Sequence, residues 1–171
     1  MRLKFFLPLY LCCLIAFSQT YRLTGESEIA VMTLGPYQPE LYSAFGHTAI
    51  RVSDPGIGID WVFNYGVFDF EQENFYLNFA KGKMVYQLGL AYYEPFRDLY
   101  IGEDRDVKEQ YLNLTLEEKQ EFFDFLMNNR KPENREYLYN YVYDNCATKV
   151  PDVLGEIFGD RIKYDLSLIH I

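Results

Sequence analysis

The feature that most constrains the fold is a short apolar leader followed by a long chain that has a single cysteine. Residues 1–18 combine two basic residues with a mostly apolar run and end on small residues ahead of Gln19, which is the pattern of a secretory signal peptide. The other two cysteines lie within this leader, so the exported chain retains only Cys146. One cysteine cannot close an internal disulfide, so a domain of about 150 residues must be held by its apolar core.

The exported chain is strongly acidic. Cleavage removes Arg2 and Lys4, and the loss of these two charges takes the formal net charge from −9 to −11. Such a chain is a poor match for nucleic acid, which binds basic surfaces. The 16 Tyr and 14 Phe predict broad aromatic packing. We expect one exported domain over residues 19–165, without a nucleic-acid partner or a cofactor.

The end of the sequence has an unusual composition. Residues 166–171 read Leu-Ser-Leu-Ile-His-Ile and look like the translation of a sequencing-library adapter. We interpret them as a non-native tail of a truncated chain, and expect the natural protein to continue past residue 165. His170 is therefore excluded, which leaves His47 as the one candidate histidine. With one thiol and one imidazole, a zinc site of about four ligands is not expected.

Three strands are predicted around His47. An apolar, β-favouring run at residues 28–34 ends at Gly35-Pro36 and predicts a buried strand. Residues 40–45 indicate a short helical approach to a second strand at 47–52, with His47 at its entrance. The third strand, at residues 60–65, follows a short glycine-containing link, so an antiparallel hairpin is the simplest connection.

Asn64 is a polar residue inside the aromatic third strand. Facing residues of an antiparallel hairpin have a constant index sum, and a sum of 111 puts Asn64 directly across from His47. A sum of 113 puts it diagonally on the same face, and an even sum puts it on the opposite face. The register stays open, but only odd sums let the amide orient the imidazole. Otherwise the alternatives for that role are Asp60, Ser43 or Asp144.

The middle of the chain alternates predicted helices and strands. These are helices at residues 71–80 and 93–100, strands at 84–90 and 106–114, and an extended segment at 136–143. The clearest helix starts at a capping box formed by Thr115 and Glu118 and runs to about Asn129. Its expected buried face is Leu116, Phe122, Phe123 and Leu126.

Cys146 is expected at the start of the last helix. Asp144 or Asn145 can cap a helix that stops at Gly159, although Pro151 requires a kink or a restart. Its expected inward residues are Ala147, Val150, Leu154, Ile157 and Phe158. The free amides and dipole of a helix start favour an anion, so we expect the pKa of Cys146 to fall from about 8.5 to roughly 3.5–7.5.

A thiol and an imidazole suggest nucleophilic catalysis. A cysteine attacks carbonyls as its thiolate, and histidine is the side chain best suited to take the proton. His47 and Cys146 are 99 positions apart in the sequence, and we expect the fold to bring them to about 3 Å, or somewhat more without substrate. The alternative is an inert buried cysteine that acts as a small hydrophobic residue.

Three segments resemble the Lnb N-terminal periplasmic domain family. They are Ser-Ala-Phe-Gly-His-Thr-Ala-Ile-Arg-Val at residues 43–52, Val-Phe-Asn-Tyr-Gly-Val-Phe-Asp-Phe at 62–70, and Asp-Asn-Cys-Ala-Thr at 144–148. The order of histidine before cysteine is similar to the circularly permuted NlpC/P60 branch of papain-like thiol enzymes. The resemblance implies an α+β fold with a papain-like antiparallel sheet packed with helices. Residues 149–152 depart from the family pattern, where an arginine at position 149 and no proline are expected.

The resemblance also implies an activity. The family is named for a lipoprotein N-acyltransferase, so Cys146 maps to the nucleophile and His47 to its base, whereas Asn64 as the orienting group is our inference. The implied reaction moves an acyl group from a phospholipid, through a Cys146 thioester, to the amino terminus of a lipoprotein. Longer members continue into membrane-spanning segments, which predicts membrane association through a missing C-terminal region. The alternatives are a thiol hydrolase of envelope peptide or ester bonds and a non-catalytic envelope-binding module.

Overall fold

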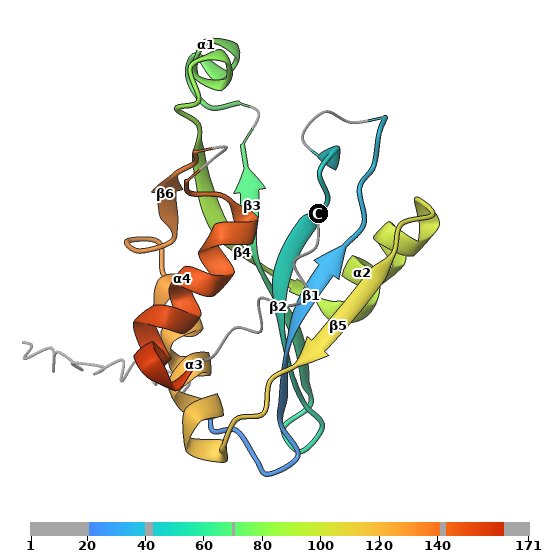
Figure 1. Cartoon of the computed structure of the whole chain (residues 1–171), viewed down its shortest axis with the longest axis vertical. Coiled ribbons are helices and arrows are strands. Elements are labelled where there is room, and N and C mark those ends of the chain that lie inside the picture. The colour runs from blue at the N-terminus through green and yellow to red at the C-terminus, as the bar shows by residue number, and fades with distance from the viewer. Residues whose placement is uncertain (1–20, 40–42, 70, 141–142, 163–171) are drawn as a thin grey trace, which may run out of the picture.

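An antiparallel sheet with helices on both faces forms the body of the protein (Figure 1). The computed structural model describes residues 21–39, 43–69, 71–140 and 143–162. The predicted signal peptide and the adapter-like tail lie outside the described residues, as do positions 40–42 of the predicted helical approach. Within the described part, no helix has both the length and the apolar composition needed to cross a membrane.

The sheet has six strands in the order β5-β1-β2-β3-β4-β6, and every neighbouring pair is antiparallel. The strands are β1 (Glu28–Leu34), β2 (His47–Asp54), β3 (Ile59–Phe68), β4 (Val85–Tyr92), β5 (Val107–Tyr111) and β6 (Glu136–Leu138). The helices are α1 (Phe75–Ala80), α2 (Tyr93–Gly102), α3 (Leu116–Asn129) and α4 (Cys146–Phe158), and a 3-10 turn η2 (Gly159–Arg161) follows α4. The predicted α+β class is confirmed, and the predicted first strand has the observed bounds of β1.

The core has two parts, one on each face of the sheet. On one face, Ile50 of β2 and Phe63 of β3 pack with the buried residues of α3 and α4. On the other face, Ala49 and Val62 pack with the α2 residues Phe96 and Tyr100. Strand residues alternate between faces, so His47 and Asn64 belong to the α2 face. The rings of Phe63 and Phe123 meet at 6.2 Å in an edge arrangement, as broad aromatic packing predicts.

Helix α1 is shorter than predicted. It begins at Phe75, whereas the sequence pattern predicted a start at residue 71. The preceding residues form a turn, in which the Glu71 amide donates to Oδ1 of Asp69 at 2.8 Å. Asn74 then has a φ of +57°, a left-handed conformation that a right-handed helix does not contain. The longer helix was therefore a wrong prediction.

The predicted bounds of helix α3 and its predicted capping box are both confirmed. The Glu118 amide donates to Thr115 Oγ1 at 3.3 Å, and the Thr115 amide donates to Glu118 Oε2 at 3.0 Å. Phe122, Phe123 and Leu126 are buried, as predicted. The prediction was wrong for Leu116, which is 41% exposed. Leu116 occupies the first turn, ahead of the part of α3 that enters the core, and Leu114 packs against the core in its place.

Helix α4 runs without interruption through Pro151, so of the two predicted alternatives, a kink or a restart, the restart is excluded. Its C-cap is Gly159, whose positive φ of +51° is a backbone conformation that glycine adopts without a steric penalty. Its buried residues are Val150, Val153, Leu154 and Phe158. Ala147 was expected to point inward but is exposed, because it lies in the first turn, where the helix emerges from the core.

Candidate active site

His47 and Asn64 meet on one face of the β2–β3 hairpin. The ladder pairs Ile50 with Phe63 and Asp54 with Ile59, so facing residues have an index sum of 113. This register places Asn64 diagonally from His47, and Nε2 of the imidazole lies 2.6 Å from Oδ1 of the amide. The structure therefore confirms an odd register, which Asn64 needs in order to orient the imidazole. The alternative orienting residues Asp60, Ser43 and Asp144 are not needed.

Gly66 makes room for this pair. The β3–β4 register shifts between Tyr65 and Val67, which makes Gly66 the extra residue of a β-bulge. A Cβ at position 66 would lie 2.6 Å from His47 Cε1, which is too close for a real contact, and 3.0 Å from Asn64 Oδ1, which is a tight one. Gly66 was not among the residues predicted for the site, although an isolated glycine inside a strand pattern is a known signal of a bulge or of close approach.

Cys146 is the first residue of α4, and the loop before it is held by side chains. Asn145 is the N-cap, and its Oδ1 accepts from the amides of Ala147 at 2.9 Å and Thr148 at 3.2 Å. The Asn145 amide in turn donates to Thr148 Oγ1 at 2.9 Å, which completes a capping box. Cys146 was predicted at a helix start, and this placement is confirmed.

Position 149, where the sequence departs from the family pattern, also supports the helix start. Nζ of Lys149 pairs with Oδ1 of Asp144 at 2.8 Å. The same ammonium lies 4.6 Å from the centre of the Tyr137 ring. Lys149 therefore ties the residue two positions before Cys146 to the first turn of α4.

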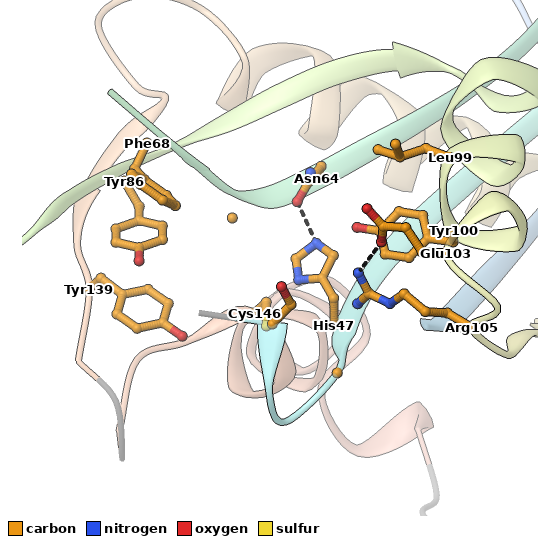
Figure 2. A pocket seen from close by; sticks show the side chains of 13 residues that line it. His47, Asn64, Phe68, Tyr86, Leu99, Tyr100, Glu103, Arg105, Tyr139 and Cys146 are labelled. Atoms are coloured by element: carbon orange, nitrogen blue, oxygen red, sulfur yellow. Dashed lines mark hydrogen bonds and ion pairs between the residues drawn. The ribbon is translucent and has the colours of Figure 1, made fainter. Parts of the chain in front are cut away.

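Cys146, His47 and Asn64 line one cavity of about 380 Å³ (Figure 2). Phe68, Tyr86 and Tyr139 form an aromatic wall on one side, in which the rings of Tyr86 and Tyr139 stack at 4.0 Å. Leu99, Tyr100, Glu103 and Arg105 form the opposite wall. The thiol and the imidazole lie between the two walls, and the fold therefore brings together residues from β2, β3 and α4 that are distant in the sequence.

The electrostatics of Cys146 differ from the prediction. Burial raises the pKa of the thiol above its ordinary value, and this effect exceeds the opposing effect of three backbone amides, those of Thr48, Ala147 and Cys146. The prediction of a lowered pKa was therefore wrong. A helix start and its amides favour the thiolate, but loss of water around a partly buried sulfur disfavours it more.

The pKa of His47 is lowered from 6.5 to about 4. Burial is the main cause, the positive charge of Arg105 adds to it, and the hydrogen bond with Asn64 opposes it. At neutral pH the site thus holds a protonated thiol and an uncharged imidazole. Because Oδ1 of Asn64 is an acceptor, the ring proton is on Nε2, and Nδ1 keeps the lone pair that can accept a proton.

The residues that form the two walls of the cavity were not predicted as site residues. Arg105 carried no recognisable signal, because it lies among acidic residues in the turn between α2 and β5. The tyrosines of the aromatic wall belong to segments that were predicted as strands, without any indication that they face a cavity. Among the described residues, no three histidine, cysteine or acidic side chains converge as metal ligands.

A family of known proteins matches the chain. The family model described as "Lnb N-terminal periplasmic domain" matches residues 18–168, which is most of the chain. Neither the curated proteins nor the solved structures contain a significant match to the chain.

Proposed function

The chain belongs to the Lnb N-terminal periplasmic domain family, which implies an exported, envelope-associated protein, and from this premise we propose that it is a thiol-dependent acyltransferase. The observation that carries the proposal is that Cys146, His47 and Asn64 line one cavity. A nucleophile, a base and a group that orients the base are the parts that thiol catalysis needs. The sequence order of histidine before cysteine supports the permuted papain-like arrangement as part of the proposal.

In the first step, the Cys146 sulfur attacks the carbonyl carbon of a phospholipid acyl ester while its proton passes to Nδ1 of His47. This general-base route suits a protonated thiol beside an uncharged imidazole. The tetrahedral intermediate then collapses, the ester C–O bond breaks, and the imidazolium returns the proton to the leaving alcohol. The product is an acyl thioester on Cys146.

In the second step, the amino group at the terminus of a lipoprotein attacks the thioester carbonyl. His47 takes a proton from the amine, the C–S bond breaks, and the departing thiolate recovers that proton. The result is an amide on the acceptor and a free Cys146. Neither step requires a metal or an organic cofactor, since the groups that exchange the proton belong to the chain itself.

Backbone amides are available for the negative charge that develops on the carbonyl oxygen. The amides of Thr48, Ala147 and Cys146 each favour the negative charge of the thiolate. An acyl carbon bonded to that sulfur would put its oxygen near the same donors. One such donor commonly lowers the barrier by about 3 to 4 kcal/mol, so the exact position of the α4 start matters for the rate.

The proposal is tested by trapping the acyl-enzyme. The exported chain is mixed with a phospholipid in detergent micelles without an amine acceptor, and its intact mass is measured. The wild type should gain one acyl chain on Cys146, and hydroxylamine should remove it. The Cys146→Ser variant should retain an ester that neutral hydroxylamine does not cleave, and Cys146→Ala should gain nothing. No mass gain in the wild type, under conditions where the protein is folded, would contradict acyl transfer.

The same experiment separates the two alternatives. A hydrolase would lose the acyl group to water at a rate that an added lipoprotein peptide does not change. An acyltransferase would hold the thioester until the peptide is added and would then N-acylate it. A binding module would form no thioester with any ester or peptide substrate.

A further inference from the structure

Arg105 lies in the wall of the cavity and is fixed by several contacts. Its Nε donates to the Gly35 carbonyl at 2.7 Å, and Nη1 donates to Glu103 Oε2 at 3.0 Å. The guanidinium carbon lies 4.2 Å from the centre of the Tyr100 ring. The residue is only 9% exposed. The guanidinium is therefore held in one orientation before any ligand enters.

One nitrogen of this guanidinium differs from the other two, which both donate hydrogen bonds within the part of the chain that the structure describes. Nη2 of Arg105 is buried and has no hydrogen-bond partner among the described residues. A buried charged donor without an acceptor is costly, and such a group requires an explanation. Figure 2 shows the guanidinium facing the centre of the cavity, beside His47. An acceptor supplied by a ligand in the cavity would satisfy it.

We propose that Arg105 is an anion subsite that binds the phosphate of the acyl donor. This inference rests on the proposed acyl transfer and specifies its donor as a lipid with a phosphate next to the ester. Guanidinium groups bind phosphate oxygens through strong, charge-assisted hydrogen bonds. In this complex a phosphate oxygen accepts from Nη2, while Nη1 stays on Glu103.

The order of groups along the cavity matches such a lipid. The aromatic wall of Phe68, Tyr86 and Tyr139 offers an apolar surface for an acyl chain. Cys146 and His47 follow in the middle, where the ester carbonyl must lie. Arg105 is on the far side, at the place of the headgroup. A glycerophospholipid has the same three parts in the same order: chain, ester and phosphate.

Glu103 faces the same guanidinium and has the opposite effect on an anion. Its carboxylate partly neutralises Arg105 and repels a phosphate, so the subsite relies on the directed Nη2 donor more than on net charge. Arg105 also contributes to the lowered pKa of His47. A bound phosphate would offset this contribution, and the imidazole would then be a stronger base when the donor is in place.

The first test compares two donors that differ only in the phosphate. Phosphatidic acid and diacylglycerol with the same chains are presented in neutral micelles, and the rate of Cys146 acylation is measured by intact mass. The wild type should prefer phosphatidic acid about 10- to 100-fold, which is the usual effect of a charged hydrogen bond. Arg105→Gln should lose this preference, so that its rates with the two lipids become equal whatever their absolute value. Equal rates in the wild type would overturn the proposal.

Control variants separate binding from folding. Arg97→Gln removes a partly exposed arginine of α2 that is paired with Asp98 at 2.7 Å and lies outside the cavity, so it should keep the full preference. If Arg105→Gln does not fold, as judged by circular dichroism, Arg105→Lys decides the question. Lysine keeps the positive charge but has a single side-chain nitrogen in place of Nη1 and Nη2. Its preference for phosphatidic acid must therefore fall below that of the wild type. An unchanged preference in Arg105→Lys would overturn the subsite.

A binding measurement distinguishes the source of the anion and does not depend on turnover. The Cε1 proton of His47 is followed by NMR during titration with glycerol 3-phosphate, inorganic phosphate or glycerol. A saturable shift with glycerol 3-phosphate alone, lost in Arg105→Gln, supports a lipid headgroup. Equal responses to both phosphates identify free phosphate and overturn the lipid assignment. No response overturns the subsite, whereas the absence of a thioester with either lipid counts against acyl transfer itself.

Discussion

Nε2 of His47 lies 2.6 Å from Oδ1 of Asn64, although the two residues belong to different strands and are 17 positions apart. The contact sets the tautomer of the ring, because the amide oxygen accepts a hydrogen bond from Nε2–H and leaves Nδ1 as the basic nitrogen. It also limits rotation of the imidazole. The proposed proton transfer from Cys146 depends on both effects.

Replacing Asn64 with alanine should slow acylation of Cys146 about 10- to 100-fold, because the ring loses its preferred tautomer and orientation. The rate is measured by intact mass with a phospholipid donor. Asn129→Ala is the matched control, since the Asn129 amide donates to Tyr65 Oη at 2.7 Å, away from His47. The control should lower stability and leave the rate unchanged. Equal rates for Asn64→Ala and the wild type would remove Asn64 from the proposed site.

Replacing Gly66 with alanine should also reduce the rate, by tenfold or more. The new methyl group would be placed 2.6 Å from His47 Cε1, so either the ring or the bulge must move. Gly102→Ala serves as the control, because a Cβ there meets no atom within 4 Å. The rate is measured in a single turnover at saturating lipid, where weaker lipid binding no longer affects it. A loss that remains under these conditions reflects displacement of His47. Full activity in Gly66→Ala would show that the ring position is not critical.

The N-cap of α4 should matter more for activity than the N-cap of α3. Asn145→Ala and Thr115→Ala each remove a side-chain cap and should each lower the free energy of unfolding by about 1 kcal/mol. Only Asn145→Ala displaces the first turn that holds Cys146, so only this variant should slow acylation. Urea unfolding and the acylation assay are run on both proteins. A similar loss of activity in both would indicate a general effect of stability.

His47 should make the protein less stable in mild acid. Its pKa is about 4 in the folded chain and near 6.5 when unfolded, so between these values the unfolded state binds one more proton. The contribution of uncharged His47 to the free energy of unfolding is therefore complete above about pH 6.5. It is lost as the pH falls towards 4, by up to about 3 kcal/mol. His47→Gln should show a smaller loss over this range in urea unfolding. An identical loss of stability in the wild type and His47→Gln would contradict a buried, uncharged imidazole.

Alkylation of Cys146 by iodoacetamide should be slow at pH 6 and should rise only at alkaline pH. The reason is that burial holds the pKa of the thiol above its ordinary value. The measurement is the pH profile of the alkylation rate of the folded chain, with an unstructured cysteine peptide as reference. An inflection below that of the peptide would instead indicate a preformed thiolate and imidazolium pair.

Much of the fold could be predicted because it depends on neighbours in the sequence. The strands β1, β2 and β3 follow from β-favouring runs bounded by turns, and the capping box of α3 needs only Thr115 and Glu118. The start of α4 at Cys146 follows from its capping residue in the same way. The start of α1 was predicted wrongly because a single backbone conformation, at Asn74, decided it.

Only part of the candidate site could be predicted from the sequence. Its three central residues could be named from residue type and spacing, and the hairpin limited Asn64 to a few registers. The choice of register required the pairing of Ile50 with Phe63, which depends on how the whole sheet packs. Arg105 reaches the same cavity from beyond α2, and no local pattern could place it there.

The sequence by itself determined which side chains could do chemistry: one thiol, one imidazole and a polar residue on a neighbouring strand. The tertiary structure alone decided their protonation states. A pKa depends on the loss of water and on nearby charges, and both are set by packing between segments as distant as His47, Arg105 and Cys146. For this reason the helix start predicted a stabilised thiolate, whereas the folded chain holds a protonated thiol.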